Sequence, residues 1–253
     1  MRLSIIVPAY NEEKLLGACL KSVREAVAFL GGRLAGDAGP MRGRPSFEAE
    51  LIVCDNNSTD ATGRIAREGG AAVVFEPVNL ISRSRDTGAG AATGDWLLFI
   101  DADSRLSAGT LAAVLEAARK GKVVGGGCLI AFDRCPWWGE LLIESWNALS
   151  RAFDLAAGSL VFCRADAFRA VGGFPADIAA GEELALSRAL KAWGKAHALG
   201  FTVLTGHRHV SSGRKFALYS PREFFQVGLA MSLHPRRAMH DPRIDRLHYD
   251  GRR

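Results

Sequence analysis

The sequence has no long hydrophobic run. Nowhere in its 253 residues does it approach the roughly 18 uninterrupted apolar residues that a membrane-spanning helix needs. The apolar stretch near the N-terminus, residues 3–7, is too short for the core of a secretion signal and ends at Pro8. We therefore expect a cytoplasmic protein that makes at most peripheral contact with the inner surface of the membrane.

The sequence also lacks a cysteine motif and a nucleic-acid-binding pattern. Its five cysteines are odd in number, widely spaced and never arranged as Cys-x-x-Cys, which predicts neither a disulfide framework nor a zinc site and suits a reducing compartment. The basic residues are scattered and are not interleaved with aromatic residues, so nucleic acid is not an expected partner. The net charge of +5 instead suits phosphate-bearing ligands or an anionic membrane surface.

Strand-like and helix-like segments alternate along the chain. Apolar runs at 3–7, 51–54, 72–75, 96–100, 123–132, 158–163 and 201–204 indicate strands. Apolar residues at helical spacing over 15–30 and 137–153 indicate helices, and helices are also expected at 61–68, 82–92, 107–120, 164–171 and 182–193. Such alternation predicts an α/β fold with a mostly parallel sheet. Three glycines at 125–127 mark a place where another backbone or a ligand comes close.

Further expectations concern loops and packing. Residues 31–46 and 206–215 have loop compositions, the second one polar and basic. Asn11 can cap the first helix, with Glu12 and Glu13 in its first turn. The helix at 137–153 is expected to pack its apolar face into the core, although that face could also line an acceptor site. The side chains near this face are Trp138, Leu141, Leu142, Ser145, Trp146 and Leu149.

The apolar run Trp96–Ile100 ends in two carboxylates, Asp101 and Asp103. Five apolar residues without interruption are typical of a strand buried on both faces. Residues two apart in an extended chain project to the same side, so both carboxylates can point beyond the carboxyl end of the strand, where open α/β sheets bind ligands. Mn²⁺ or Mg²⁺ would relieve their repulsion and suits oxygen ligands together with phosphates. The alternative is that both are solvated loop aspartates.

Several segments carry a resemblance to a known family. They read IVPAYNEE at 6–13, VCDNNSTD at 53–60, RSRDTGA at 83–89, FIDAD at 99–103, GGF at 172–174 and GEELALSR at 181–188. In this order and spacing, from Leu3 to about Phe216, they resemble the family-2 inverting glycosyltransferases of the GT-A fold. The resemblance implies an enzyme that moves a sugar from a nucleotide-diphosphate donor to an acceptor hydroxyl. The sequence does not identify the sugar, the base or the acceptor, which could be a glycan, a lipid or a small molecule.

The resemblance also assigns roles to individual residues. It implies a nucleotide site made of Pro8, Ala9, Tyr10, Glu12, Asp55, Asn57, Arg83, Arg85, Asp101, Ala102, Arg214 and Lys215. It implies that Asp101 and Asp103 hold Mn²⁺ or Mg²⁺ against the diphosphate, with His209 as a third ligand in preference to His207. One departure is Asp86, where the family usually has asparagine.

The implied general base is Glu183, at the start of a helix. In the family this base is the second acid of a Glu-Asp pair, and here the pair is Glu182-Glu183. Adjacent helical residues point about 100° apart, so only one of them can face the sugar, and Glu182 is assigned a supporting contact. The alternative is that both are ordinary acidic residues, which are favoured at a helix N-terminus.

The resemblance, which ends at about Phe216, and the residue pattern beyond it together predict how the chain is divided. Residues 1–233 form one domain, with a nucleotide-binding half at 1–104, an acceptor and catalytic half at 105–216 and a C-terminal helix at 217–233, followed by a basic tail at 234–253. Two other functions stay open. A Mg-dependent sugar-phosphate nucleotidyltransferase would normally carry a glycine- and arginine-rich phosphate loop after the first strand. A non-catalytic nucleotide- or membrane-binding module would not need Asp101, Asp103 and Glu183.

Overall fold

The structure is a computed structural model that describes residues 1–36, 46–156, 159–176 and 181–218, with the side chain of Lys215 outside the described part. The strands are β1 (Arg2–Ala9), β2 (Arg33–Leu34), β3 (Glu48–Asp55), β4 (Ala72–Phe75), β5 (Trp96–Ile100), β6 (Val123–Phe132), β7 (Leu160–Arg164) and β8 (Gly200–Ser211). The helices are α1 (Leu16–Phe29), α2 (Thr62–Glu68), α3 (Ile81–Gly90), α4 (Ala108–Lys120), α5 (Trp137–Phe153), α6 (Ala165–Val171), α7 (Glu182–Ala196) and α8 (Arg214–Leu218).

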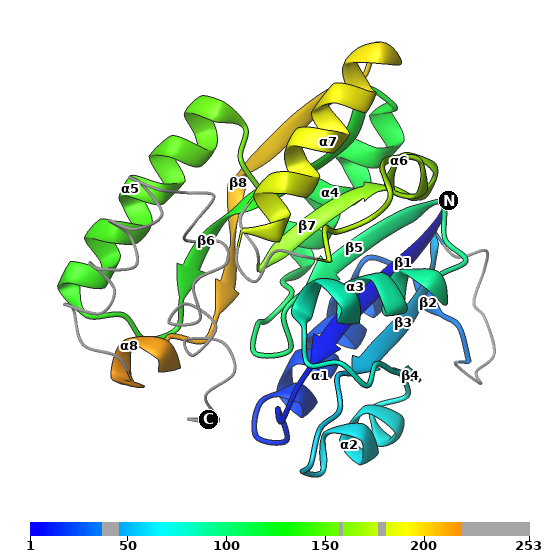
Figure 1. Cartoon of the computed structure of the whole chain (residues 1–253), viewed down its shortest axis with the longest axis vertical. Helices are drawn as coiled ribbons and strands as arrows, with labels where there is room; N and C mark the ends of the chain where they lie inside the picture. The colour runs from blue at the N-terminus through cyan, green and yellow to red at the C-terminus, as the bar shows by residue number, and fades with distance from the viewer. Residues whose placement is uncertain (37–45, 157–158, 177–180, 219–253) are drawn as a thin grey trace.

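The described strands form one sheet in the order β2-β3-β1-β5-β7-β6-β8, with β4 also paired to β3 (Figure 1). Parallel pairing joins β1 to β3 and β5, β3 to β2 and β4, and β6 to β8. Among these strands β7 alone runs antiparallel to its neighbours, β5 and β6. The prediction of an α/β fold with a mostly parallel sheet is therefore confirmed.

Helices cover both faces of the sheet because successive residues of the buried strands point to opposite sides. Ile5 of β1 packs in one core with Leu16 of α1 and Leu111 of α4. Its neighbour Ile6 packs in a second core with Leu186 of α7. All five residues of β5 are buried, as the uninterrupted apolar run predicted. Because helices cover both faces of the sheet, a ligand can reach these strands only at their ends.

The first helix begins later than predicted. α1 starts at Leu16, and Asn11 has a left-handed backbone with a φ of 50°. The Asn11 Oδ1 atom accepts a hydrogen bond from the Thr59 amide at 2.8 Å, and the Glu13 carboxylate accepts one from the Ala61 amide at 3.2 Å. Asn11 and Glu13 therefore do not cap α1. They instead tie the turn after β1 to the turn after β3, so that the two strand ends are held together.

Two predicted loops contain strand residues. β8 continues through Ser211, because a register shift after Cys128 lets β6 pair again, with Ile130 opposite His209. β8 lies at the edge of the sheet, which leaves its polar side chains room in solvent. In the first loop, Arg33–Leu34 forms β2 and Leu34 is buried, whereas residues 37–45 lie outside the described part. The predicted helix 217–233, beyond Leu218, and the tail 234–253 also lie outside it.

Helix α5 forms where predicted, but its apolar side points away from the sheet. Leu141 is 65% exposed and Leu149 is 49% exposed, so the expectation that this face packs into the core is wrong. The cause is Asn147, whose Oδ1 accepts from the Ile130 amide at 3.0 Å and whose Nδ2 donates to the Ile130 carbonyl at 2.9 Å. β7 pairs only with residues 125–127 of β6, and Asn147 satisfies backbone groups that β7 leaves unpaired.

Three further predictions concern the cysteines, the N-terminus of α4 and membrane-spanning helices. All five cysteines are free thiols. Ser107 caps α4, as its position predicted, by accepting from the Thr110 amide at 3.0 Å. In the described ranges, no helix combines the length and the apolar character needed to cross a bilayer.

The glycines of β6 predict where a methyl group would be least tolerated. A Cβ added at Gly126 would overlap the carbonyl oxygen of Thr202, whereas one added at Gly90 would meet nothing within 4 Å. We expect Gly126→Ala to lower the free energy of unfolding by about 1–3 kcal/mol through overpacking. Gly90→Ala is the matched control and should leave stability unchanged or slightly higher. Urea denaturation of both variants measures this, and equal stabilities would contradict the close approach.

Candidate functional site

The carboxyl ends of β1, β3 and β5 meet at one edge of the sheet. Ala9, the last residue of β1, pairs with Asp55, the last residue of β3. Asp101 follows β5, which pairs with β1 on its other side. The structure thus brings together the predicted nucleotide-site residues Pro8, Ala9 and Asp55 with the predicted metal ligand Asp101. Of the other residues expected here, Ala102 is buried, Tyr10 is half-buried and Asn57 is exposed.

The turn after β3 fixes the Asp55 carboxylate. Its Oδ1 accepts a hydrogen bond from the Ser58 amide at 2.9 Å. Gly63 leaves room for the other oxygen, since a Cβ at that position would lie 2.7 Å from Asp55 Oδ2. Asn57 sits in the left-handed region with a φ of 62°, which asparagine tolerates better than most residues. The result is a preformed acidic corner beside the end of β1.

The two arginines of the RSR segment have different surroundings. Arg83 is 45% exposed and pairs with the buried Glu76 at 3.1 Å, and Glu76 also accepts from the Thr87 hydroxyl at 2.7 Å. Arg85 is 1% exposed. Arg85 is sealed between α3, α7 and the end of β5, whereas Arg83 is open to solvent. The assignment of both arginines to the base or the diphosphate stays a prediction.

Arg85 binds three carboxylates. Its Nη2 lies 3.1 Å from Asp101 Oδ1. Its Nη1 lies 2.6 Å from Glu182 Oε1 and 2.9 Å from Glu183 Oε1. The guanidinium also lies 5.2 Å from the ring centre of Phe174. Sequence reasoning missed this role, and no local signal in the RSR segment distinguishes the arginine that faces inward from the one that faces solvent.

The pKa values of the two glutamates at the start of α7 shift in opposite directions. Burial raises the pKa of Glu182 well above its usual range, and the neighbouring Glu183 carboxylate adds to the effect. Burial alone would also raise the pKa of Glu183, but the Arg85 guanidinium holds that pKa below its usual value. The side chain of Glu183 is the more accessible of the two. The surroundings of the pair therefore favour a proton on Glu182 and the negative charge on Glu183.

Arg214 brings the far end of the described chain to this edge. Its Nη1 donates to Glu12 Oε2 at 2.8 Å, and its Nη2 lies 3.3 Å from Asp103 Oδ2. The Ser211 hydroxyl donates to the other oxygen of Asp103 at 3.1 Å. Glu12, Asp103 and Arg214, which are up to 202 residues apart, therefore form one cluster. Lys215, the other residue of the predicted basic pair, has its side chain outside the described part.

The predicted metal ligands are only partly brought together. In the part of the chain that the structure describes, no three His, Cys, Asp or Glu side chains are grouped so as to hold a metal ion. His209 is fully buried, and burial lowers its pKa to about 4, so the ring is neutral. Neither ring nitrogen makes a hydrogen bond of normal geometry with another described residue. His207, the alternative ligand, is exposed.

Asp101 and Asp103 alone can still suit a divalent cation. Mg²⁺ is usually bound through one or two carboxylates and completes its coordination with substrate phosphates and water rather than with a protein cage. Two aspartates at the edge of the sheet match that donor set.

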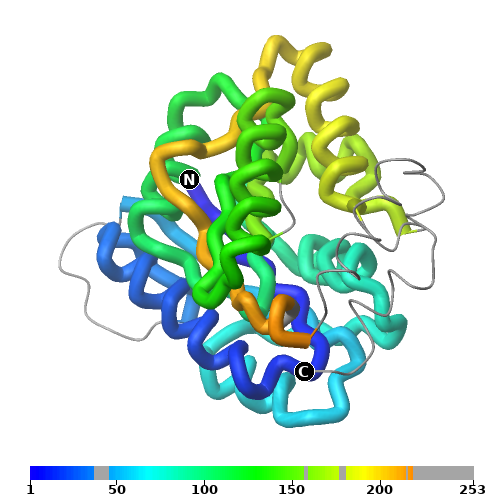
Figure 2. Tube along the Cα trace, turned by 90° about the vertical axis from the view of Figure 1, so that its left-hand side faces the viewer, coloured from blue at the N-terminus to red at the C-terminus, as the bar shows by residue number. Residues whose placement is uncertain are grey.

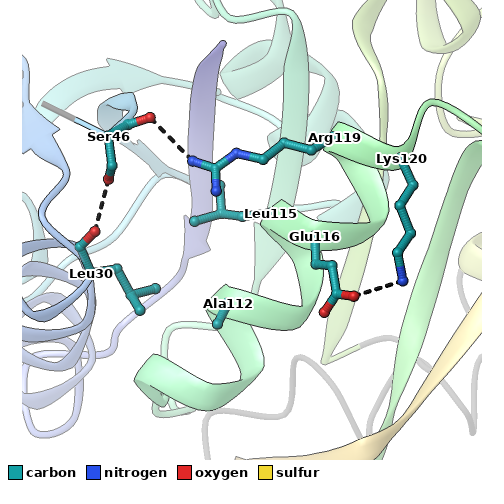
Figure 3. Close-up of a pocket in the computed structure, with 7 residues that line it drawn as sticks. All are labelled: Leu30, Ser46, Ala112, Leu115, Glu116, Arg119 and Lys120. Carbon is teal, nitrogen blue, oxygen red and sulfur yellow. Dashed lines mark hydrogen bonds and ion pairs between the residues drawn. The ribbon is translucent and has the colours of Figure 1, made fainter.

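A separate cavity lies between the C-terminal end of α1, Ser46 and one side of α4 (Figure 3). It measures about 330 Å³ and is lined by Leu30, Ser46, Ala112, Leu115, Glu116, Arg119 and Lys120. Leu30 directly follows α1, and the α4 residues extend from Ala112 to Lys120 at its C-terminal end. Its charged groups are already bound, since Arg119 donates to the Ser46 carbonyl at 3.1 Å and Lys120 pairs with Glu116 at 2.6 Å. The cavity is distinct from the carboxylate cluster.

Comparisons with known proteins identify the family. The sequence model of glycosyl transferase family 2 matches residues 4–169, and this chain belongs to that family, as the resemblance predicted. An uncharacterized glycosyltransferase of Mycobacterium tuberculosis is 30% identical over 152 residues, which cover 58% of this chain and 60% of the relative. A dolichyl-phosphate beta-glucosyltransferase of Drosophila melanogaster is 36% identical over 111 residues, covering 41% of this chain and 31% of the relative. The chain thus matches less than two thirds of these relatives' lengths.

Solved structures share the fold. A mannosyltransferase from Pyrobaculum calidifontis, in complex with GDP-Man and Mn²⁺, superposes with a TM-score of 0.66 and 19% identity over 98% of this chain and 70% of that chain. Glucosyl-3-phosphoglycerate synthase from Mycobacterium tuberculosis, in complex with Mn²⁺, UDP and phosphoglyceric acid, has a TM-score of 0.57 and 18% identity over 89% of this chain and 73% of that chain. The predicted GT-A fold is confirmed.

Asp86, the departure from the family pattern, holds the turn that carries Phe174. Its Oδ1 accepts from the Phe174 amide at 3.0 Å, and a Cβ at Gly173 would lie 2.7 Å from that oxygen. Burial raises the pKa of Asp86 from 3.8 to about 6, although the Phe174 amide and Arg85 oppose the shift. Because folding raises this pKa, the folded state loses stability as the pH rises from about 4 to about 6.

We expect Asp86→Asn to remove this loss. Asparagine keeps the acceptor for the Phe174 amide and cannot ionise. The stability of the variant relative to the natural chain should therefore grow by about 2–3 kcal/mol between pH 4 and pH 7, because one pKa unit is worth about 1.4 kcal/mol. Chemical denaturation at both pH values measures the difference. A stability difference that does not change with pH would contradict the burial of an ionised Asp86.

Proposed function

We propose that this chain is an inverting glycosyltransferase, which transfers a sugar from a nucleoside-diphosphate donor to an acceptor hydroxyl with help from a divalent cation. One observation carries the proposal. The buried Arg85 joins Asp101, at the end of β5, to Glu182 and Glu183, at the start of α7. A candidate metal ligand and a candidate base, which come from different halves of the chain, therefore meet on one side chain.

The accessible and ionised Glu183 has the properties of a general base. A sugar hydroxyl is a poor nucleophile, and removal of its proton by a positioned carboxylate typically contributes about 10²–10⁴-fold to the rate. Arg85 orients Glu183 and keeps it ionised near neutral pH. Glu182 is more deeply buried and protonated, which makes it the supporting residue. Single displacement from the face opposite the leaving diphosphate would invert the configuration of the anomeric carbon.

The donor and the metal are proposed from chemistry and from relatives. Asp101 and Asp103 would hold Mn²⁺ or Mg²⁺, which stabilises the charge of a departing nucleoside diphosphate. Pro8, Ala9, Tyr10, Glu12, Asp55 and Asn57 would line the nucleotide, with Arg83, Arg214 and Lys215 available to its phosphates. Relatives of the same fold have been solved with GDP-Man and Mn²⁺, and with UDP-GlcNAc. Membership of glycosyl transferase family 2 favours this function over a nucleotidyltransferase or a non-catalytic module.

The base assignment is tested by two isosteric variants. Glu183→Gln should keep nucleotide affinity and lower the transfer rate by about 10²-fold or more. Glu182→Gln should be much milder, because glutamine mimics the protonated acid that Glu182 already is near neutral pH. Transfer rates and nucleotide affinities are measured for both. If Glu182→Gln were inactive and Glu183→Gln active, the two roles would be reversed. If both variants were fully active, neither glutamate would be the base, and both would be ordinary acidic residues at a helix N-terminus.

The metal site is tested by thermal shift with nucleoside diphosphates. In the natural chain, a matching diphosphate at about 100 times its Kd with Mn²⁺ should stabilise the fold by about 2.7 kcal/mol. Asp103→Ala should abolish the Mn²⁺-dependent part of this gain. Asp166→Ala removes an exposed carboxylate that pairs with Arg164 and serves as the control. A metal-dependent gain that survives in Asp103→Ala would exclude this residue as a ligand.

A further inference from the structure

Helix α5 is amphipathic in the reverse sense. Two of the residues that it buries, Asn147 and Ser150, are polar. Its other side exposes large apolar residues, which we call the apolar surface of α5, namely Trp137 at 79%, Leu141 at 65%, Leu142 at 49%, Leu149 at 49% and Phe153 at 63%. They extend from one end of the helix to the other. Contiguous apolar patches beyond a few hundred Å² are rare on soluble monomers and mark binding surfaces.

The apolar surface lies on the outer side of the fold. The inner side of α5 packs on β6 and β8. In Figure 1 α5 lies at the edge of the molecule, and Figure 2, which views the molecule from that side, shows α5 at the front. Trp138, at the N-terminal end of α5, packs edge-on against Phe216 of α8 with ring centres 5.4 Å apart. Its neighbour Trp137 points outward and belongs to the apolar surface.

The pattern of α5 is the same in both directions along the helix. Trp137, Leu141, Ser145, Leu149 and Phe153 are each four residues apart, the spacing of neighbours on a helix surface. A two-fold axis at Ser145 would therefore set Leu141 of one copy against Leu149 of another, and Trp137 against Phe153. Self-complementarity of this kind is what a two-fold dimer interface requires. The small Ser145 at the centre lets two helices approach closely.

The charged residues beside the apolar surface fit the same antiparallel pairing. Glu140 and Arg151 are eleven residues apart, about three helical turns, so they lie on one side of α5. Both are exposed, and neither forms an ion pair with another residue of the described part. Glu140 precedes Ser145 by five positions and Arg151 follows it by six, so the two-fold axis brings Glu140 of each copy beside Arg151 of the other. Glu144, close to the axis, is paired with Arg208 of its own chain.

We propose that the apolar surface of α5 is a dimer interface, at which a second copy of this chain binds in antiparallel orientation around a two-fold axis at Ser145. An aromatic side chain buries about 150–250 Å², so two aromatic residues and three leucines supply several hundred Å² per copy. Standard interfaces bury about 800 Å² per partner. We therefore expect a reversible dimer with a Kd in about the micromolar range. A lipid bilayer fits less well, because the exposed Glu140 would repel anionic lipid.

Sedimentation equilibrium of the full chain tests the interface. Between about 1 and about 100 μM, a range chosen around a micromolar Kd, the natural protein should change from the mass of one chain toward that of two. Leu141→Asp/Leu149→Asp should raise the Kd at least about 100-fold, because it places unpaired charges between the copies. Phe29→Asp places the same charge at an exposed apolar residue outside α5 and should leave the Kd unchanged. Slow hydrogen exchange of the Ile130 amide, which donates to Asn147, reports that α5 still packs on the sheet.

Cysteine substitutions test the position of the axis. Ser145→Cys lies on the proposed axis, so mild oxidation should join two copies by a disulfide, which needs Cα atoms about 4.4–6.8 Å apart. Ala152→Cys is the matched control, since it is also exposed on α5. Antiparallel pairing separates residue 152 of one copy from residue 152 of the other by fourteen positions, about 21 Å, so this variant should not cross-link. The natural chain, with its own free cysteines, is the blank.

Charge reversal tests the orientation independently. Glu140→Arg alone should raise the Kd by about threefold or more, because it replaces both proposed ion pairs by like charges. Glu140→Arg/Arg151→Glu should restore the natural Kd, because each pair is then rebuilt in reverse. Failure of the second substitution to restore the Kd would contradict the antiparallel orientation.

Other outcomes would overturn the proposal as a whole. A natural protein that stays monomeric over the whole concentration range has no such interface. A dimer that Leu141→Asp/Leu149→Asp leaves intact would be formed by another surface, and a disulfide through Ala152→Cys but not Ser145→Cys would mean parallel pairing. Cosedimentation of a monomeric protein with vesicles of phosphatidylserine and phosphatidylcholine, if Leu141→Asp/Leu149→Asp abolished it, would assign the surface to lipid. None of these readouts depends on glycosyl transfer.

Discussion

The structure of the site depends on one buried cation. Arg85 is sealed from solvent and pairs with Asp101, Glu182 and Glu183. Moving an unpaired charge of this kind out of water costs several kcal/mol, so folding must bring its partners to it. Those partners lie up to 98 positions away in the sequence. The requirement to pair Arg85 therefore fixes the start of α7 against the end of β5, and with it the distance between the two halves of the proposed active site.

The same cluster explains how two adjacent glutamates come to differ. One guanidinium cannot fully compensate three carboxylates in a buried place, and a proton on Glu182 reduces the excess negative charge. Because that proton settles on the more deeply buried acid, the more accessible Glu183 keeps its charge. Arg214 repeats the pattern at the neighbouring aspartate, where it binds Glu12 and Asp103. Among the described residues, carboxylates outnumber guanidinium groups along this edge, which suits a cation.

The sequence was informative where function and fold follow from local pattern. The apolar run before Asp101 and Asp103 predicted a buried strand and the placement of both acids at its carboxyl end, and the order of the motifs predicted the family. Periodicity also located α5, but it defines a stripe without saying which side the stripe faces. That choice was made by Asn147, which binds the Ile130 backbone. Likewise, Asn11 looked like a helix cap because its partner, Thr59, lies 48 residues away. Contacts between distant segments decided each of these cases.

Helix α8 connects the site with the apolar surface of α5. Arg214, at its first position, binds Glu12 and Asp103, and Phe216, two residues later, packs on Trp138 and Phe132. A short helix with both ends occupied cannot shift at one end without straining the contacts at the other, because interiors are packed too closely to absorb the movement. The position of Arg214 beside Asp103 therefore depends on the packing of Phe216 against Trp138 and Phe132, two residues that take no part in the proposed chemistry.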